Sequence, residues 1–137
     1  MSLFNVIDVA GSAMNAQSVR LNVTASNLAN AGSVSGDPDR VYRARQPVFE
    51  SFQQSLANHS GIAGVRMTSI VESSAPLEMR FQPDHPDADE NGNVYVSNVK
   101  NVEEMVNMLS ASRSYKNNVE IINTTKDLLM QTLSLGR

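Results

Sequence analysis

Residues 3–30 of the chain, LFNVIDVAGSAMNAQSVRLNVTASNLAN, contain only two charged side chains, Asp8 and Arg20. Two interleaved sets of residues recur every seven positions here: Leu3, Ala10, Gln17 and Thr24, and Ile7, Met14, Leu21 and Leu28. This 4-3-4-3 spacing places both sets on one helix face, as in the seam of a coiled coil. The opposite face is also uncharged, whereas an ordinary surface helix has Lys and Glu there. We therefore expect an N-terminal helix that packs against neighbours on more than one side.

A second long helix is predicted from about residue 102 to residue 133, because apolar residues recur there with a period close to 3.6. Asn98 and Asn101 are the two candidate N-caps, Glu103 and Glu104 suit the first turn, and Gly136 follows the last turn. The expected apolar stripe is Val102, Met105, Val106, Leu109, Val119, Ile122, Leu129 and Leu133.

The segment between the helices is predicted to be a small β-rich insert. Apolar and polar residues alternate, as in half-buried strands, and the predicted strands are residues 42–48, 65–71, 77–81 and 94–96. Loops are expected at residues 32–38 and 83–92, the second with an Asn-Gly turn.

The order of these elements predicts an elongated α+β fold, in which the N- and C-terminal helices pack as a coiled-coil-like pair and the small β-rich insert lies between them in sequence. We expect three parts: residues 1–31, the N-terminal helix of an assembly domain; residues 32–97, the loop and β-rich insert; and residues 98–137, the C-terminal helix of the assembly domain.

Composition argues against several functional classes. The 137 residues include 11 basic and 14 acidic side chains, and a net charge of -3 gives no electrostatic reason to bind nucleic acid. The chain has no cysteine, so disulfides and thiolate metal ligands are excluded. No segment is apolar enough to be expected to span a bilayer. The N-terminus lacks the pattern of a secretory signal, so a role outside the cytoplasm would need export without cleavage.

One segment resembles a known metal-binding site. Residues 87–92, Asp-Ala-Asp-Glu-Asn-Gly, are similar to the first half of a calcium-binding EF-hand loop. The twelfth position of such a loop needs a bidentate glutamate, and here it is Asn98; Pro86 also prevents an entering helix. We therefore expect a solvated turn without a metal or cofactor, with a calcium-binding module as an alternative. His59 and His85 fall in predicted loops without a nucleophile motif, so no catalytic residues are expected.

The end of the first helix carries a family motif. Residues 25–30, Ala-Ser-Asn-Leu-Ala-Asn, resemble the Ala-Asn-Asn-Ile-Ala-Asn signature of flagellar rod and hook proteins. The longer insertion before Tyr42, the acidic loop at 83–89 and the stretches 98–115 and 132–136 are similar to proximal-rod members of the flagella basal body rod protein family. The resemblance covers nearly the whole chain, and the motif residues are Ala25, Asn27, Leu28, Ala29, Asn30 and Tyr42.

This resemblance implies a structural subunit of the proximal rod in the bacterial flagellar basal body, and not an enzyme. Such a subunit self-assembles helically through its terminal helices, transmits torque, and is exported through the flagellar type III apparatus without a cleaved signal to form part of the rod crossing the periplasm. The implied partners are other rod subunits, copies of itself and the export apparatus. No nucleic acid, membrane insertion or small-molecule substrate is implied.

The predicted assembly interface consists of the apolar positions of the two helices: Ile7, Met14, Leu21, Leu28, Val102, Val106, Leu109, Val119, Ile122, Leu129 and Leu133. Phe52 and Leu56 fit the Phe-x-x-x-apolar element that the family's export gates are thought to read; the alternative explanation, which we favour, is that Phe52 simply packs within the small lobe. The alternative function is a cytoplasmic adaptor built on a helical hairpin.

Overall fold

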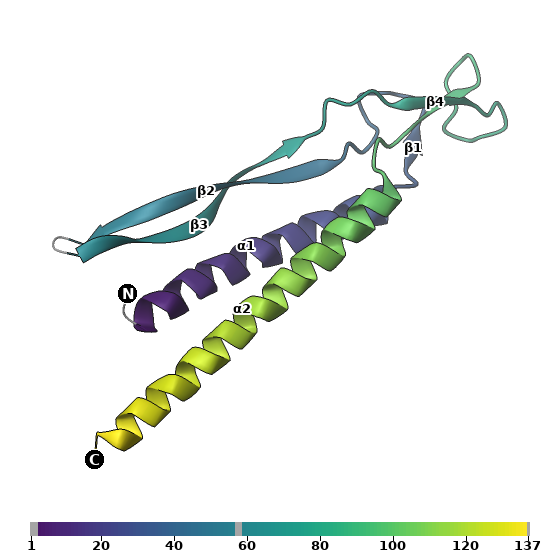
Figure 1. Cartoon of the computed structure of the whole chain (residues 1–137). Helices are drawn as coiled ribbons and strands as arrows, with labels where there is room; N and C mark the ends of the chain where they lie inside the picture. The colour runs from purple at the N-terminus through teal and green to yellow at the C-terminus, as the bar shows by residue number, and fades with distance from the viewer. Residues whose placement is uncertain (1–2, 57–58, 137) are drawn as a thin grey trace.

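The computed structural model describes residues 3–56 and 59–136, without the side chains of residues 54–62. Over these residues the chain forms two long helices separated by five strands, and the predicted α+β class is confirmed. Helix α1 (Leu3–Asn30) and helix α2 (Asn101–Leu135) lie side by side in opposite directions, which makes the molecule elongated (Figure 1). Neither helix, within the described ranges, is long and apolar enough to cross a membrane.

A long antiparallel hairpin lies along the other side of α1. Its strands are β2 (Arg45–Leu56) and β3 (His59–Glu72), which pair from Arg45 opposite Glu72 to Leu56 opposite His59. Both strands contact α1, so α1 lies between α2 and the hairpin (Figure 1). The expectation that α1 packs on more than one side is therefore met within a single chain.

A small three-stranded sheet forms the end of the molecule next to the C-terminus of α1 (Figure 1). Its strand order is β1 (Val34–Ser35), β5 (Asn93–Val96) and β4 (Glu78–Phe81), with antiparallel neighbours. The predicted strands at 77–81 and 94–96 are confirmed within one residue. Strand β1 lies inside the predicted loop at 32–38, because two residues are too few to show alternation.

The insertion before Tyr42 and the acidic loop pack against each other. A Cβ atom on Gly36 would lie 2.5 Å from the backbone oxygen of Asp87 and 2.9 Å from the backbone nitrogen of Asp89. Only a glycine allows the two loops to approach this closely.

The predicted N-cap of α2 is wrong. The capping position is Lys100, whose side chain makes no capping hydrogen bond, and the helix begins at Asn101. The Asn98 side chain is used elsewhere: its Oδ1 accepts the N–H of Ala44 at 2.8 Å, and its Nδ2 donates to the carbonyl of Ala75 at 3.0 Å. Asn98 therefore joins the start of β2 to the chain that follows β3.

The core is thin and made of small residues. The buried apolar side chains of the described residues are Ala10, Ala16, Val23, Val41, Ala44, Val94, Val99 and Ala111. Many larger apolar side chains, including Phe4, Phe81 and Leu135, are exposed instead. Since apolar burial is the main favourable term in folding, a single copy obtains little of it for its length.

Candidate assembly surfaces and the helix–hairpin junction

Burial along α1 follows the heptad spacing only in part, because Ala16, Val23 and Asn27, which lie outside both heptad sets, are also buried. Ala10 and Thr24 are buried, and the predicted interface residues of this helix are half-buried. These residues are Ile7, Met14, Leu21 and Leu28.

The face of α2 that packs against α1 is more polar than predicted. Its buried residues are Glu104, Ala111 and Thr125, and half-buried residues continue the same spacing: Met108, Tyr115, Asn118, Ile122 and Leu129. Across this interface, Arg20 Nη2 donates to Asn107 Oδ1 at 3.2 Å. The predicted residues Val119, Ile122 and Leu129 are half-buried, but the first turns of α2 use a carboxylate and an amide where we expected apolar side chains.

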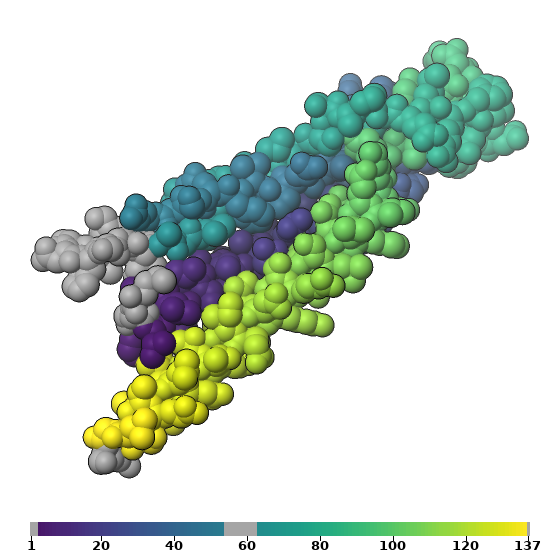
Figure 2. Space-filling view, in the orientation of Figure 1, coloured from purple at the N-terminus to yellow at the C-terminus, as the bar shows by residue number. Residues whose placement is uncertain are grey.

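The remaining apolar residues of α2 point away from α1. Near its start, Val102 is 75% exposed, Met105 57%, Val106 60% and Leu109 69%. We call these four residues the outer apolar face. Leu133, also predicted at the interface, is 69% exposed near the other end of the helix. Figure 2 shows α2 open to solvent along the side turned away from α1 and the hairpin.

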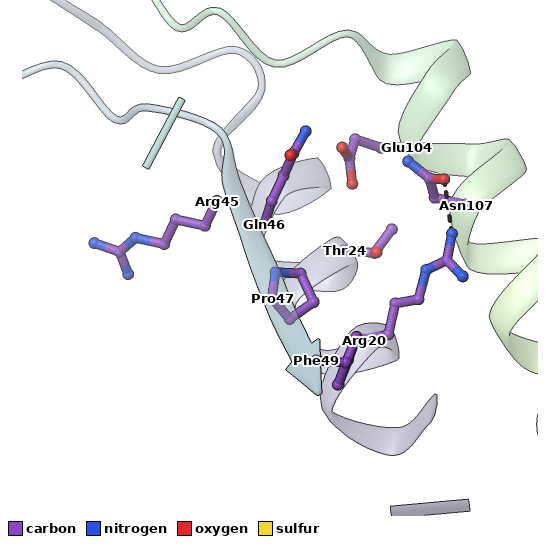
Figure 3. A pocket seen from close by; sticks show the side chains of 8 residues that line it. All are labelled: Arg20, Thr24, Arg45, Gln46, Pro47, Phe49, Glu104 and Asn107. Carbon is purple, nitrogen blue, oxygen red and sulfur yellow. Dashed lines mark hydrogen bonds between the residues drawn. The ribbon is translucent and has the colours of Figure 1, made fainter. Parts of the chain in front are cut away.

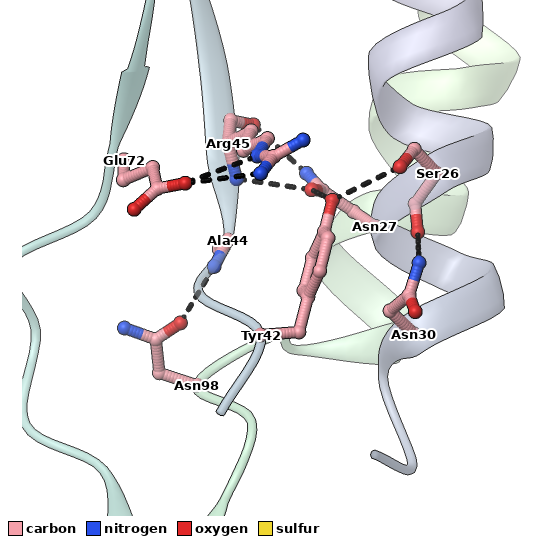
Figure 4. Close-up of polar contacts among 8 residues, drawn as sticks. All are labelled: Ser26, Asn27, Asn30, Tyr42, Ala44, Arg45, Glu72 and Asn98. Carbon is pink, nitrogen blue, oxygen red and sulfur yellow. Dashed lines mark hydrogen bonds and ion pairs between the residues drawn. The ribbon is translucent and has the colours of Figure 1, made fainter. Parts of the chain in front are cut away.

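The family motif forms a junction between α1 and the hairpin (Figure 4). Asn27 is 1% exposed. Its Oδ1 accepts the backbone N–H of Arg45 and the hydroxyl of Tyr42, both at 2.9 Å, and its Nδ2 donates to the backbone carbonyl of Arg45, also at 2.9 Å. The amide thus satisfies both backbone groups of Arg45, as a neighbouring strand would, and fixes the start of β2 on α1.

Asn30 and Ser26 make polar contacts at the end of α1. Asn30 Nδ2 donates to the carbonyl of Ser26 at 2.8 Å in the last turn of α1, and the hydroxyls of Ser26 and Tyr42 lie 3.1 Å apart. Leu28 is half-buried, whereas Ala25 and Ala29 are exposed. The spacing in the sequence gave no sign that Asn27 and Tyr42 bond to each other; only the resemblance marked them.

Phe52 packs inside the hairpin, next to α1. It pairs with Gly64 across the strands, where a Cβ atom would lie 2.7 Å from the Phe52 ring and 3.2 Å from Ser12 Oγ. The guanidinium of Arg66 lies 5.9 Å from the centre of the same ring. Ser12 Oγ also accepts the N–H of Val65 at 3.2 Å, so this part of β3 rests on α1. The side chain of Leu56, the other half of the candidate export element, lies outside the described residues.

In the acidic loop, the carboxylate of Asp89 organises the turn. It accepts the backbone N–H of Asn91 at 2.8 Å and that of Asn93 at 2.7 Å, and these hydrogen bonds, the one from Asn93 above all, lower its pKa below the ordinary value. His85 Nδ1 accepts the N–H of Asp87 at 3.1 Å. Within the described ranges, no three acidic or histidine side chains gather in a way that would hold a metal ion. The side chain of His59 lies outside the described residues.

Comparison with known proteins finds matches at both ends of the chain. A family model described as "Flagella basal body rod protein" matches residues 7–36, and one described as "Flagellar basal body rod FlgEFG protein C-terminal" matches residues 90–135. The two matches cover most of α1 and all of α2, and they define the class as flagellar basal-body rod proteins.

Three full-length relatives narrow the class. The chain is 52% identical to the flagellar basal-body rod protein FlgC of Yersinia enterocolitica and 50% identical to that of Salmonella typhimurium, with all of both chains covered in each comparison. It is 41% identical to FlgC of Buchnera aphidicola subsp. Acyrthosiphon pisum over 99% of both chains. The chain belongs to the family of the flagellar basal-body rod protein FlgC.

Proposed function

We propose that this chain is a structural, non-enzymatic subunit of the flagellar basal-body rod that polymerises helically through its two terminal helices. Residues 1–31 and 98–137 make up the assembly domain, and residues 32–97 form the side lobe. The subunit leaves the cytoplasm through the flagellar type III export apparatus without cleavage. It then joins copies of itself and other rod subunits in the proximal rod, where it crosses the periplasm and transmits torque.

The observation that carries this proposal is the outer apolar face of α2. Four adjacent large apolar side chains are each more than half exposed, next to a core of mostly alanine and valine. Contiguous exposed apolar surface on a soluble protein marks an interaction site. In a helical polymer, neighbouring subunits bury this surface in every repeat.

A substitution on the outer apolar face tests the proposal. Leu109→Asp places a charge on a side chain that is already 69% exposed, so the purified monomer should keep its helical content and melting temperature. A neighbour that buries this position would have to desolvate the carboxylate, so we expect rod formation and motility to be lost while secretion of the subunit continues. Asn117→Asp, at an exposed position two turns further along α2, is the matched control.

Motile cells with normal rods built from Leu109→Asp subunits would overturn the proposed interface. If Leu109→Asp blocked secretion of the subunit instead of its assembly, the outer apolar face would be assigned to recognition by the export apparatus.

Phe52 and Leu56 remain a proposed export element. Packing of the Phe52 ring on Gly64 supports a structural role, so the two roles must be separated by experiment. If export reads this pair, Phe52→Ala combined with Leu56→Ala should reduce secretion more than it reduces the stability of the purified chain. Normal secretion of the double variant would leave packing as the role of Phe52.

A further inference from the structure

A polar cavity of about 320 Å³ lies where α1, α2 and the start of β2 meet (Figure 3). Two oppositely charged side chains line it without bonding to each other: Arg20 from α1 and Glu104 from α2. The Arg20 guanidinium is turned toward Asn107, whereas the Glu104 carboxylate is turned toward the Gln46 side of the cavity (Figure 3).

Glu104 is only 9% exposed, yet none of the described residues donates a hydrogen bond or forms an ion pair with its carboxylate. Arg45, the other basic residue beside the cavity, points away from it and pairs with Glu72 at 3.1 Å (Figure 3). The carboxylate still meets water, because it borders the open cavity, and it is therefore free to accept a partner that enters there. Its place in the first turn of α2 favours a negative charge, and the cavity leaves this charge open to a cation from outside the single chain.

The rest of the cavity suits a long basic side chain. Pro47 and Phe49 line it with apolar surface, on which the methylene groups of such a side chain can lie, and an aromatic ring also attracts a cation. The Thr24 hydroxyl and the Gln46 amide oxygen face the cavity and, within the described part of the chain, have no hydrogen-bond partner. They would accept the N–H groups that remain once an ammonium has paired with Glu104.

We propose that the cavity receives a lysine side chain from α2 of a second copy of this chain, whose ammonium pairs with Glu104. The proposal rests on the proposed function, because only an assembly brings a second copy to this site. The chain has three lysines, and Lys100 is already paired with Glu103 at 2.9 Å. Lys116 and Lys126 are exposed on α2 and have no ion-pair partner among the described residues. Lys116 also continues the helical stripe of the outer apolar face, which the assembly covers.

A zero-length cross-link tests this contact directly. A carbodiimide joins a carboxylate to an amine only when the two are in contact. Glu104 lies 12 residues before Lys116 on one helix, a separation of about 18 Å along the axis, and Lys126 lies further away still. A cross-link from Glu104 to either lysine must therefore join two copies. In isolated basal bodies we expect this cross-linked peptide by mass spectrometry, and in the purified monomer we expect none.

Glu104→Gln separates the role of this residue in assembly from its role in folding. The variant keeps the size of the side chain and removes a charge that has no ion-pair partner among the described residues, so the monomer should melt at nearly the same temperature. Incorporation into rods should fall by more than about tenfold, because the incoming ammonium would be buried without a partner. Glu103→Gln, which changes the exposed neighbouring carboxylate, should leave both measurements unchanged.

Normal rod incorporation of Glu104→Gln would overturn the proposal. A cross-link from Glu104 to a different rod protein, or none in intact basal bodies, would also overturn it. The proposed rod function would survive each of these results as long as Leu109→Asp still blocks assembly.

Discussion

Replacing Asn27 by alanine should destabilise the chain more than any other single change at the junction of α1 and the hairpin. The substitution leaves the backbone N–H and carbonyl of Arg45 without the partners that lie at 2.9 Å. An unsatisfied buried backbone group costs about 1–3 kcal/mol. The Arg45 side chain is exposed, so water reaches part of this site, and we expect a loss of about 2–4 kcal/mol in the free energy of unfolding. The Tyr42 hydroxyl adds little, because Ser26 Oγ is 3.1 Å away as an alternative partner.

The measurement is denaturant unfolding of the purified monomer followed by circular dichroism. Asn22→Ala is the matched control, since Asn22 is exposed on the same helix, and it should change stability by less than about 0.5 kcal/mol. Tyr42→Phe should cost about 1 kcal/mol or less, because Asn27 keeps both bonds to Arg45. An Asn27→Ala variant as stable as the Asn22→Ala control would refute the view that this amide holds the hairpin on α1.

Three further predictions concern other parts of the molecule. Gln17 Oε1 is buried without a hydrogen-bond partner, so Gln17→Met should raise the free energy of unfolding by about 1–3 kcal/mol, measured by the same titration. Gly36→Ala should lower it by about 1–3 kcal/mol because the methyl group meets the backbone of the acidic loop, whereas Gly32→Ala, where a Cβ atom meets nothing within 4 Å, should be close to neutral. The lowered pKa of Asp89 means that its turn is fully stabilised above the ordinary aspartate pKa and loses that stabilisation as the pH falls through the lowered value. The protection factors of the Asn91 and Asn93 amides, which compare exchange with that of an unstructured peptide at the same pH, should fall over this acidic range in the normal chain and stay constant in Asp89→Asn.

The helical architecture is the part that could be predicted from the sequence. The 4-3 spacing of residues 3–28 correctly predicted helix α1, but Ala16, Val23 and Asn27, which are buried, lie outside that spacing. The alternating segments correctly placed β4 and β5, but the strands predicted at 42–48 and 65–71 overlap only part of β2 (Arg45–Leu56) and of β3 (His59–Glu72). The ends of the hairpin strands were missed, because their sequence does not alternate and their backbones are held by pairing with each other.

The packing face of α2 was not predictable from apolar periodicity. At the start of this helix the most apolar stripe faces solvent, and the face against α1 includes Glu104 and Asn107. A rule that places apolar residues inward assumes that the single chain is the complete folding unit. Where neighbouring subunits bury some of the apolar side chains, this rule identifies residues of the interface between subunits instead of the core of one chain.

The asparagine junctions were also beyond sequence reasoning alone. Asn98 was predicted as a helix cap because asparagine favours that position, but its amide bonds to segments 23 and 54 residues away in sequence. Asn27 likewise bonds to Arg45 across 18 residues. Such bonds form only when the fold brings a distant loop next to the asparagine. The preferences of single residues for helix or cap positions contain no information about these distant contacts.

The two amides at the base of the hairpin have a mechanical consequence for the proposed role in transmitting torque. When a strand is pulled along its length, its ladder bonds share the force, whereas a sideways push on the outer hairpin acts as a lever on the bonds at its root. Asn27 and Asn98 hold that root, on the backbone nitrogens of the adjacent residues Arg45 and Ala44. Sideways stiffness of the hairpin therefore depends on these bonds, and on the hydrogen bond from Val65 to Ser12 further along the hairpin, more than on the thin apolar core. Weakening either amide should make the lobe yield under sideways load while the helix pair beneath it keeps its shape.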